Sequence, residues 1–132
     1  MDRDVIVVGW TPNDQGEAAI EAAVAEAGRR DAVLHVVNAS SGNSYADNKM
    51  ATDEQLDGLR ERLAGQGVEH EVAQSVGRLE PAEAILEAAD ETAAALVVLG
   101  IRRRTPVGKL LMGSTAQRVL LQAKCPVLAV KP

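Results

Sequence analysis

The stretch ALVVLGIRRRTPVGKLLMGSTAQRVL, residues 95–120, decides the fold expected for this chain. Residues 95–100 form an unbroken apolar run, which is typical of a strand that is buried on both faces of a parallel sheet. A basic loop with three consecutive arginines follows over residues 101–113, and Ser114 is the expected N-cap of a helix. The apolar residues after it share one helical face: Ala116, Val119, Leu120 and Ala123. The stretch therefore predicts a strand, a loop and a helix in direct succession.

The same alternation extends over all 132 residues. Apolar runs predict strands at 5–9, 32–38, 95–100 and 126–130, and apolar residues at helical spacing predict helices around 20–27, 56–63, 82–89 and 116–123. Gly28 is the expected end of the first helix. Residues 68–76 alternate apolar and polar side chains, which places that strand at a sheet edge. We expect an α/β fold: one domain over residues 1–132, with a single doubly wound sheet of five parallel strands in the order 3-2-1-4-5 and helices on both faces.

Charge is distributed unevenly along the chain. Residues 1–91 hold all 19 acidic residues and seven basic ones, whereas residues 92–132 hold seven basic residues and no acidic one, for a net charge of −5. The basic last third indicates a local anion site, or else a run of solvated basic residues.

Aromatic residues make up 2%, which argues against a platform for single-stranded nucleic acid. No apolar run approaches the length of a membrane span, and one cysteine without an export signal favours the cytoplasm.

The strand order predicts where a ligand would bind. In doubly wound sheets ligands bind outside the carboxyl ends of the strands, where the strand order reverses. Here that point lies between strands 1 and 4, so the loops at residues 10–13 and 101–113 meet there. A helix that opens at Gly113 and Ser114 presents free N–H groups to an anion, and the neighbouring hydroxyls and arginines add donors and charge.

Sequence patterns of other phosphate-binding and catalytic sites are not found. A P-loop would need glycine at position 103 and Ser or Thr at position 110, where the chain has Arg103 and Leu110. No G-x-G-x-x-G follows the first strand. Cys125 has no acid–base partner nearby in the sequence, and two distant histidines give no metal-ligand spacing, so neither a catalytic residue nor a metal site is predicted. For Trp10, at the end of the first strand, a place in the pocket wall and a place in the core are equally compatible with the sequence.

Several stretches, spread over the whole chain, resemble the universal stress protein family. The resemblance is carried by VIVVGW (5–10), LHVV (34–37), EPAEAIL (80–86), LGIRRRTPVGKLLMGSTAQRVL (99–120) and CPVLAV (125–130). It implies the doubly wound fold argued above, and it implies a homodimer through the last strand, residues 126–130. An uncovered apolar edge strand is compatible with such pairing.

One branch of that family binds ATP through the motif G-x-x-G, nine further residues and G-[ST]. Gly100 and the pair Gly113-Ser114 match this motif with the correct spacing, whereas Arg103 replaces the middle glycine. Thr11 stands where ATP-binding members carry an Asp, and Val36 stands where the family often contacts adenine. Arg103 either fills the crevice or clamps a smaller phosphate. The candidate binding residues are Thr11, Pro12, Val36, Gly100, Arg102, Arg103, Gly113, Ser114 and Thr115.

Three functional hypotheses follow. The first is a cytoplasmic stress protein that binds ATP with Mg, another adenine nucleotide or another phosphate ligand, and that acts as a sensor or regulator. Arg103 and Thr11 would weaken its binding of ATP. The second is a dimeric adaptor that binds no nucleotide and contacts a partner protein. The third is a weak ATPase, for which Asp14 is the only nearby candidate base. Neither a nucleic acid nor a membrane is expected as a partner.

Overall fold

The computed structural model describes residues 3–40, 50–77, 79–102 and 112–132. Strands and helices alternate through this part of the chain, as the sequence predicts. The elements are β1 Val5–Gly9, α1 Asp14–Arg30, β2 Val33–Ser40, α2 Asp53–Gly65, β3 His70–Val76, α3 Pro81–Thr92, β4 Leu96–Gly100, α4 Ser114–Gln122 and β5 Val127–Val130. The strands form one parallel sheet in the order β3-β2-β1-β4-β5, which confirms the expected topology.

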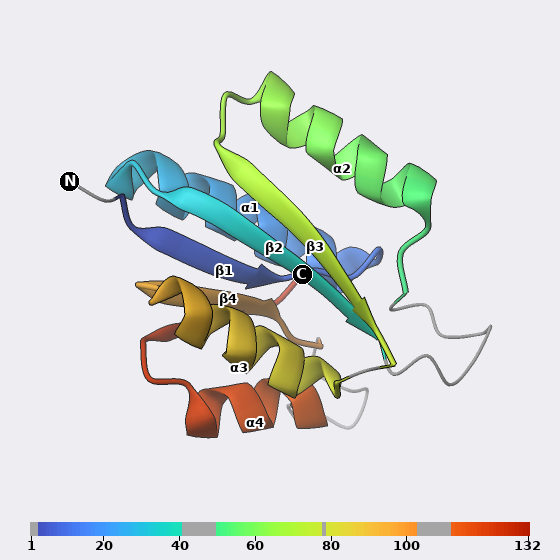
Figure 1. Ribbon diagram of the computed structural model, residues 1–132, viewed down its shortest axis with the longest axis vertical. Coiled ribbons are helices and arrows are strands. Elements are labelled where there is room, and N and C mark those ends of the chain that lie inside the picture. The colour runs from blue at the N-terminus through green and yellow to red at the C-terminus, as the bar shows by residue number, and fades with distance from the viewer. Residues whose placement is uncertain (1–2, 41–49, 78, 103–111) are drawn as a thin grey trace.

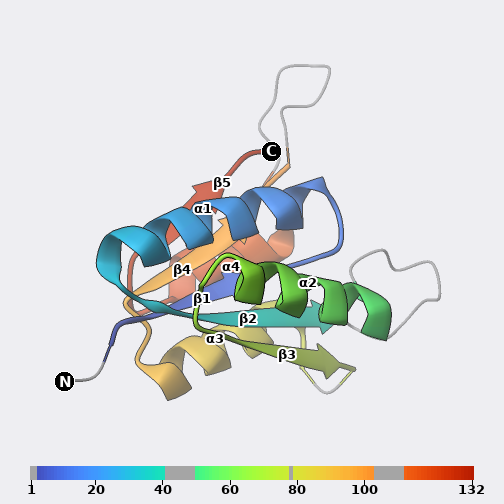
Figure 2. The same cartoon turned by 90° about the horizontal axis from the view of Figure 1, so that it is seen from above.

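Alternate side chains of a strand point to opposite faces of the sheet. Since both sets are apolar here, helices cover both faces. Ile6 and Val8 of β1 lie in a core with α1 and α2, whereas Val7 lies in a second core with α3 and α4. All three side chains are fully buried. Figure 1 and Figure 2 show α1 and α2 on one side of the sheet and α3 and α4 on the other. The expected doubly wound architecture is thus confirmed.

Two helix boundaries differ from expectation. Helix α1 continues through Gly28 to Arg30 and ends at Asp31, which adopts a left-handed conformation. Asp31 provides the left-handed residue that ends the helix, so Gly28 is not needed for this purpose. A Cβ atom on Gly28 would meet nothing within 4 Å. Helix α4 begins at Ser114 with Gly113 as its N-cap, so the assignment of Ser114 as N-cap was wrong by one residue.

None of the described helices is long and apolar enough to cross a membrane.

Candidate functional site

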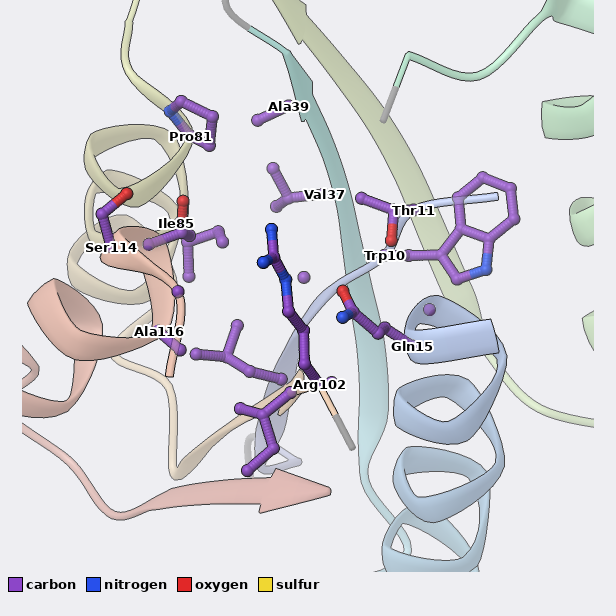
Figure 3. Close-up of a pocket in the computed structure, with 17 residues that line it drawn as sticks. Trp10, Thr11, Gln15, Val37, Ala39, Pro81, Ile85, Arg102, Ser114 and Ala116 are labelled. Atoms are coloured by element: carbon purple, nitrogen blue, oxygen red, sulfur yellow. The ribbon is translucent and has the colours of Figure 1, made fainter. Parts of the chain in front are cut away.

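A cavity of about 160 Å³ opens at the carboxyl ends of β1, β2 and β4, between the first turns of α1, α3 and α4. This is the crevice that the strand order predicts. Figure 3 shows labelled side chains of β2, α1, α3 and α4 around it, together with Arg102. Its apolar walls come mostly from the core on the α3/α4 side, and its polar groups come from the loops and helix starts. The apolar wall residues include Val37, Ala39, Pro81, Ile85 and Leu99.

Three glycines allow close packing below the cavity: Gly16 and Gly100 at the start of α1, and Gly9 beside β4 and α3. A Cβ atom on Gly16 would lie 1.7 Å from the Thr11 carbonyl oxygen, and one on Gly100 would lie 2.0 Å from the Gln15 carbonyl oxygen. A Cβ on Gly9 would lie 2.8 Å from Leu99 Cδ2. Gly100, which the motif identified as a nucleotide-binding position, is therefore also required for packing of the main chain.

Thr11 lines the cavity, but its hydroxyl is engaged within its own loop. Thr11 Oγ1 donates to Asn13 Oδ1 at 2.7 Å, and the same Oδ1 accepts the Gly16 N–H at 3.0 Å. Asn13 thereby caps α1. Pro12 lies away from the cavity, in a shallow groove between α1 and α2. Of these two candidate residues, the structure therefore brings only Thr11 to the cavity.

The start of α4 supplies the anion-binding groups of the cavity. Ser114, Thr115 and Ala116 line the cavity. The N-cap of α4 is Gly113, which has no side chain that could cap the first N–H groups of the helix. The first N–H groups of a helix lack partners within the helix and carry the positive end of its dipole. A Cβ on Gly113 would meet nothing within 4 Å, so the N-cap position itself is not crowded. This geometry suits a phosphate or another anion.

The contribution of β2 differs from expectation by one residue. Val36 is fully buried in the core with α1 and α2, so its side chain does not line the cavity. Val37 and Ala39 line it instead, because neighbouring residues of a strand face opposite sides of the sheet. The Val36 side chain thus lies on the other face of the sheet from the cavity, and a contact of Val36 with a ligand stays a prediction.

Arg102 is the described arginine of the basic loop, and it enters the cavity. Its side chain is exposed to solvent through the mouth. Figure 3 shows the guanidinium reaching inward toward Val37. Arg103, together with the rest of the loop through residue 111, lies outside the described residues.

Asn38 supports the site from below, and the sequence analysis missed it. Its side chain is fully buried beyond the apolar run of β2. Asn38 Nδ2 donates to the Trp10 carbonyl at 2.9 Å, and Oδ1 accepts from the Ala51 N–H at 3.0 Å and from Gln74 Nε2 at 2.9 Å. A polar residue that continues a buried strand is the one signal that could have drawn attention to it. Asn38 fixes the backbone of Trp10, which both lines the cavity and packs in the core.

The described lining of the cavity is formed by neutral side chains and Arg102. The described residues that line it include no carboxylate and no imidazole. Asp14 borders the grooves beside α1 instead. Burial raises the pKa of the Cys125 thiol, and the nearby Asp90 carboxylate raises it further, which disfavours the reactive thiolate. No group of three potential metal ligands occurs within the described ranges.

Comparison with known proteins assigns the family. The model of the universal stress protein family matches residues 3–131. A universal stress protein of Mycolicibacterium smegmatis is 46% identical over 128 residues, which cover 97% of this chain and 98% of that protein. The chain therefore belongs to the universal stress protein family.

Solved structures of the family share the fold. A universal stress protein from Archaeoglobus fulgidus superposes with a TM-score of 0.80 at 31% identity, over 99% of this chain and 100% of that one. A universal stress protein from the same organism, solved in complex with dAMP, gives a TM-score of 0.64 at 27% identity over 98% of both chains.

Proposed function

We propose that this chain binds an adenine nucleotide or another phosphate-bearing ligand in the cavity and acts as a cytoplasmic sensor or regulator in the stress response. The observation that carries the proposal is that Ser114 and Thr115, in the first turn of α4, line the same cavity as Arg102, because the N–H groups and the dipole of a helix start favour an anion. The dAMP complex of the Archaeoglobus fulgidus protein supports the nucleotide class. In this proposal Thr11 and Gly113 contact the ligand, and Mg accompanies it where the ligand is ATP.

A ligand that binds only the folded protein should stabilise it. At a hundred times its Kd the free energy of unfolding should rise by about 2.7 kcal/mol. We would record thermal unfolding of the wild type with magnesium-ATP, AMP and inorganic phosphate, each over a concentration series. A midpoint that rises with concentration supports the proposal. Midpoints unchanged with all three at millimolar concentration would contradict it.

Gly113→Asp should separate ligand binding from folding. The N-cap has an extended backbone (φ −65°, ψ 160°) and open space at Cβ, so aspartate fits and can cap α4. We expect the free protein to gain about 0.5–1 kcal/mol, because a carboxylate at a helix start is favourable. The same carboxylate would repel a bound phosphate. The apparent affinities for phosphate and AMP, measured from the rise of the unfolding midpoint with ligand concentration, should therefore fall at least tenfold.

Gly58→Asp is the matched control for this prediction. Gly58 is exposed on α2, and a Cβ there would meet nothing within 4 Å. The control adds the same charge away from the cavity, and its ligand response should equal that of the wild type. Equal ligand responses of Gly113→Asp and Gly58→Asp would remove the α4 start from the binding site.

An adaptor function is the second candidate, and the open edge of β5 favours it. The carbonyls of Pro126 and Val130 accept hydrogen bonds from the β4 side, with N···O distances of 3.0 and 2.8 Å. By alternation, Val127 and Ala129 direct their N–H and C=O groups toward the open edge. The exposed apolar Leu128 lies between them. These groups suit pairing with a second copy, so we propose a homodimer through residues 126–130.

Ala129→Pro should abolish such a dimer without unfolding the protomer. Proline removes the outward N–H of this edge strand and leaves the bonds to β4 intact. We expect the molecular mass from light scattering after size exclusion to fall from a dimer to a monomer. Val76→Pro is the control, since Val76 ends the opposite edge strand, β3, and is exposed. A wild-type monomer, or an Ala129→Pro dimer, would exclude pairing through β5.

A weak ATPase is the least supported alternative. In this reading Asp14 would serve as the base, but it borders the grooves beside α1 and not the cavity. Asp14→Asn should leave any measured ATP hydrolysis unchanged. Loss of hydrolysis in this variant, with ligand binding retained, would instead support a catalytic role.

A further inference from the structure

The Arg102 side chain lines the cavity, and its backbone position is well defined. Ile101 is held by a hydrogen bond from its N–H to the Val130 carbonyl at 2.8 Å, and its side chain is buried in the core with α3 and α4. The chain direction at Arg102 is therefore fixed by its neighbour. From this position the guanidinium extends into the cavity toward Val37 (Figure 3).

The cavity around the guanidinium has apolar and polar walls. Val37, Ala39 and Ile85 are apolar, whereas Thr11 and Gln15 offer neutral oxygens, and Arg102 forms no ion pair with another described residue. A cation beside apolar walls gains from an anionic partner. The start of α4, across the same cavity, favours an anion as well. A compact anion between the two would satisfy both.

The size of the cavity distinguishes between two kinds of phosphate ligand. With Arg102 inside, its volume is about 160 Å³. Pockets that enclose drug-sized molecules typically measure about 300–1,000 Å³. The space left beside Arg102 therefore suits a phosphate-sized anion, and a nucleoside would need the volume that the side chain fills.

We propose that Arg102 determines the ligand size of this cavity: with its side chain inside, it clamps a compact phosphate dianion against the start of α4, and it must leave before a nucleoside monophosphate can bind. This inference rests on the proposed function, because it assumes a phosphate site in the cavity. Arg102 is thus a specificity-determining residue that favours small phosphate compounds and competes with a nucleoside.

The test measures the Kd of inorganic phosphate and of dAMP by titration calorimetry for the wild type, Arg102→Ala and Arg102→Met. Alanine removes both charge and bulk, so phosphate binding should weaken at least tenfold while dAMP binding tightens about tenfold. Methionine retains bulk without charge, so phosphate binding should weaken and dAMP binding should not improve. Arg29→Ala is the charge-matched control, since Arg29 is exposed in the last turn of α1 and lies outside the cavity.

The outcomes separate this inference from the proposed function. If dAMP binding weakens in Arg102→Ala as much as phosphate binding does, Arg102 is a general anion clamp and the size-selection proposal is wrong. The same conclusion follows if both Kd values equal those of the wild type. If neither probe binds to the wild type or to any variant, the proposed phosphate site itself fails. Only opposite changes for the two probes in Arg102→Ala support the proposal.

Discussion

Gly100→Ala should lower the thermal midpoint of unfolding by roughly 10 °C or more. The added Cβ would lie 2.0 Å from the Gln15 carbonyl oxygen, and this contact is to main-chain atoms that cannot rotate away. The first turn of α1 would have to move off the end of β4. Such overpacking costs about 3 kcal/mol or more where the backbone must shift.

Gly58→Ala is the control, and we expect it to change the thermal midpoint in the opposite direction. Gly58 lies within α2, where an added methyl group meets nothing within 4 Å. Alanine favours a helix interior over glycine by about 0.5–1 kcal/mol, so Gly58→Ala should raise the midpoint slightly. Both variants are compared with the wild type by calorimetry. A Gly100→Ala midpoint within 2 °C of the wild type, about the effect of half a kcal/mol, would show that α1 adapts at little cost.

Asn38→Leu should destabilise the protein by about 3–5 kcal/mol, because it leaves several buried polar groups without their partner. The Trp10 carbonyl, the Ala51 N–H and the Gln74 amide all bond to the Asn38 side chain. Leucine is similar in size, so the loss is one of hydrogen bonding rather than of volume. Urea unfolding measures this change directly.

Gln74→Leu serves as the comparison for Asn38. Gln74 is exposed on the edge strand β3, and it donates to Asn38 and to the Ala51 carbonyl. Removing it takes away only one of the partners of Asn38, so the loss should be less than half as large. An equal loss in both variants would mean that the Asn38 contacts to Trp10 and Ala51 contribute little.

The sheet was predictable from the sequence because each strand carries its own signal. Residues 5–9 are apolar throughout, as a strand with helices on both faces requires, and they coincide with β1. The alternation at residues 68–76 correctly placed β3 at an edge. The order of the strands then located the crevice, which the cavity occupies.

The details of the site depended on contacts that no local pattern records. Val36 and Val37 are adjacent and identical in type, and both faces of β2 are buried, so the sequence could not say which valine faces the cavity. The packing role of Gly100 arises from the carbonyl of Gln15, which is 85 positions away in the chain. The importance of Asn38 likewise appears only once the Trp10 and Ala51 backbones are brought to it.

The position of Trp10 gives this protein an optical probe of its own. It is the one tryptophan in the sequence, its side chain is 4% exposed, and its Nε1–H has no partner among the described residues. An indole in such surroundings emits at short wavelength, and the emission should shift to the red when water reaches it. Since Trp10 packs in the α1/α2 core, its fluorescence reports on unfolding in the unlabelled wild-type chain.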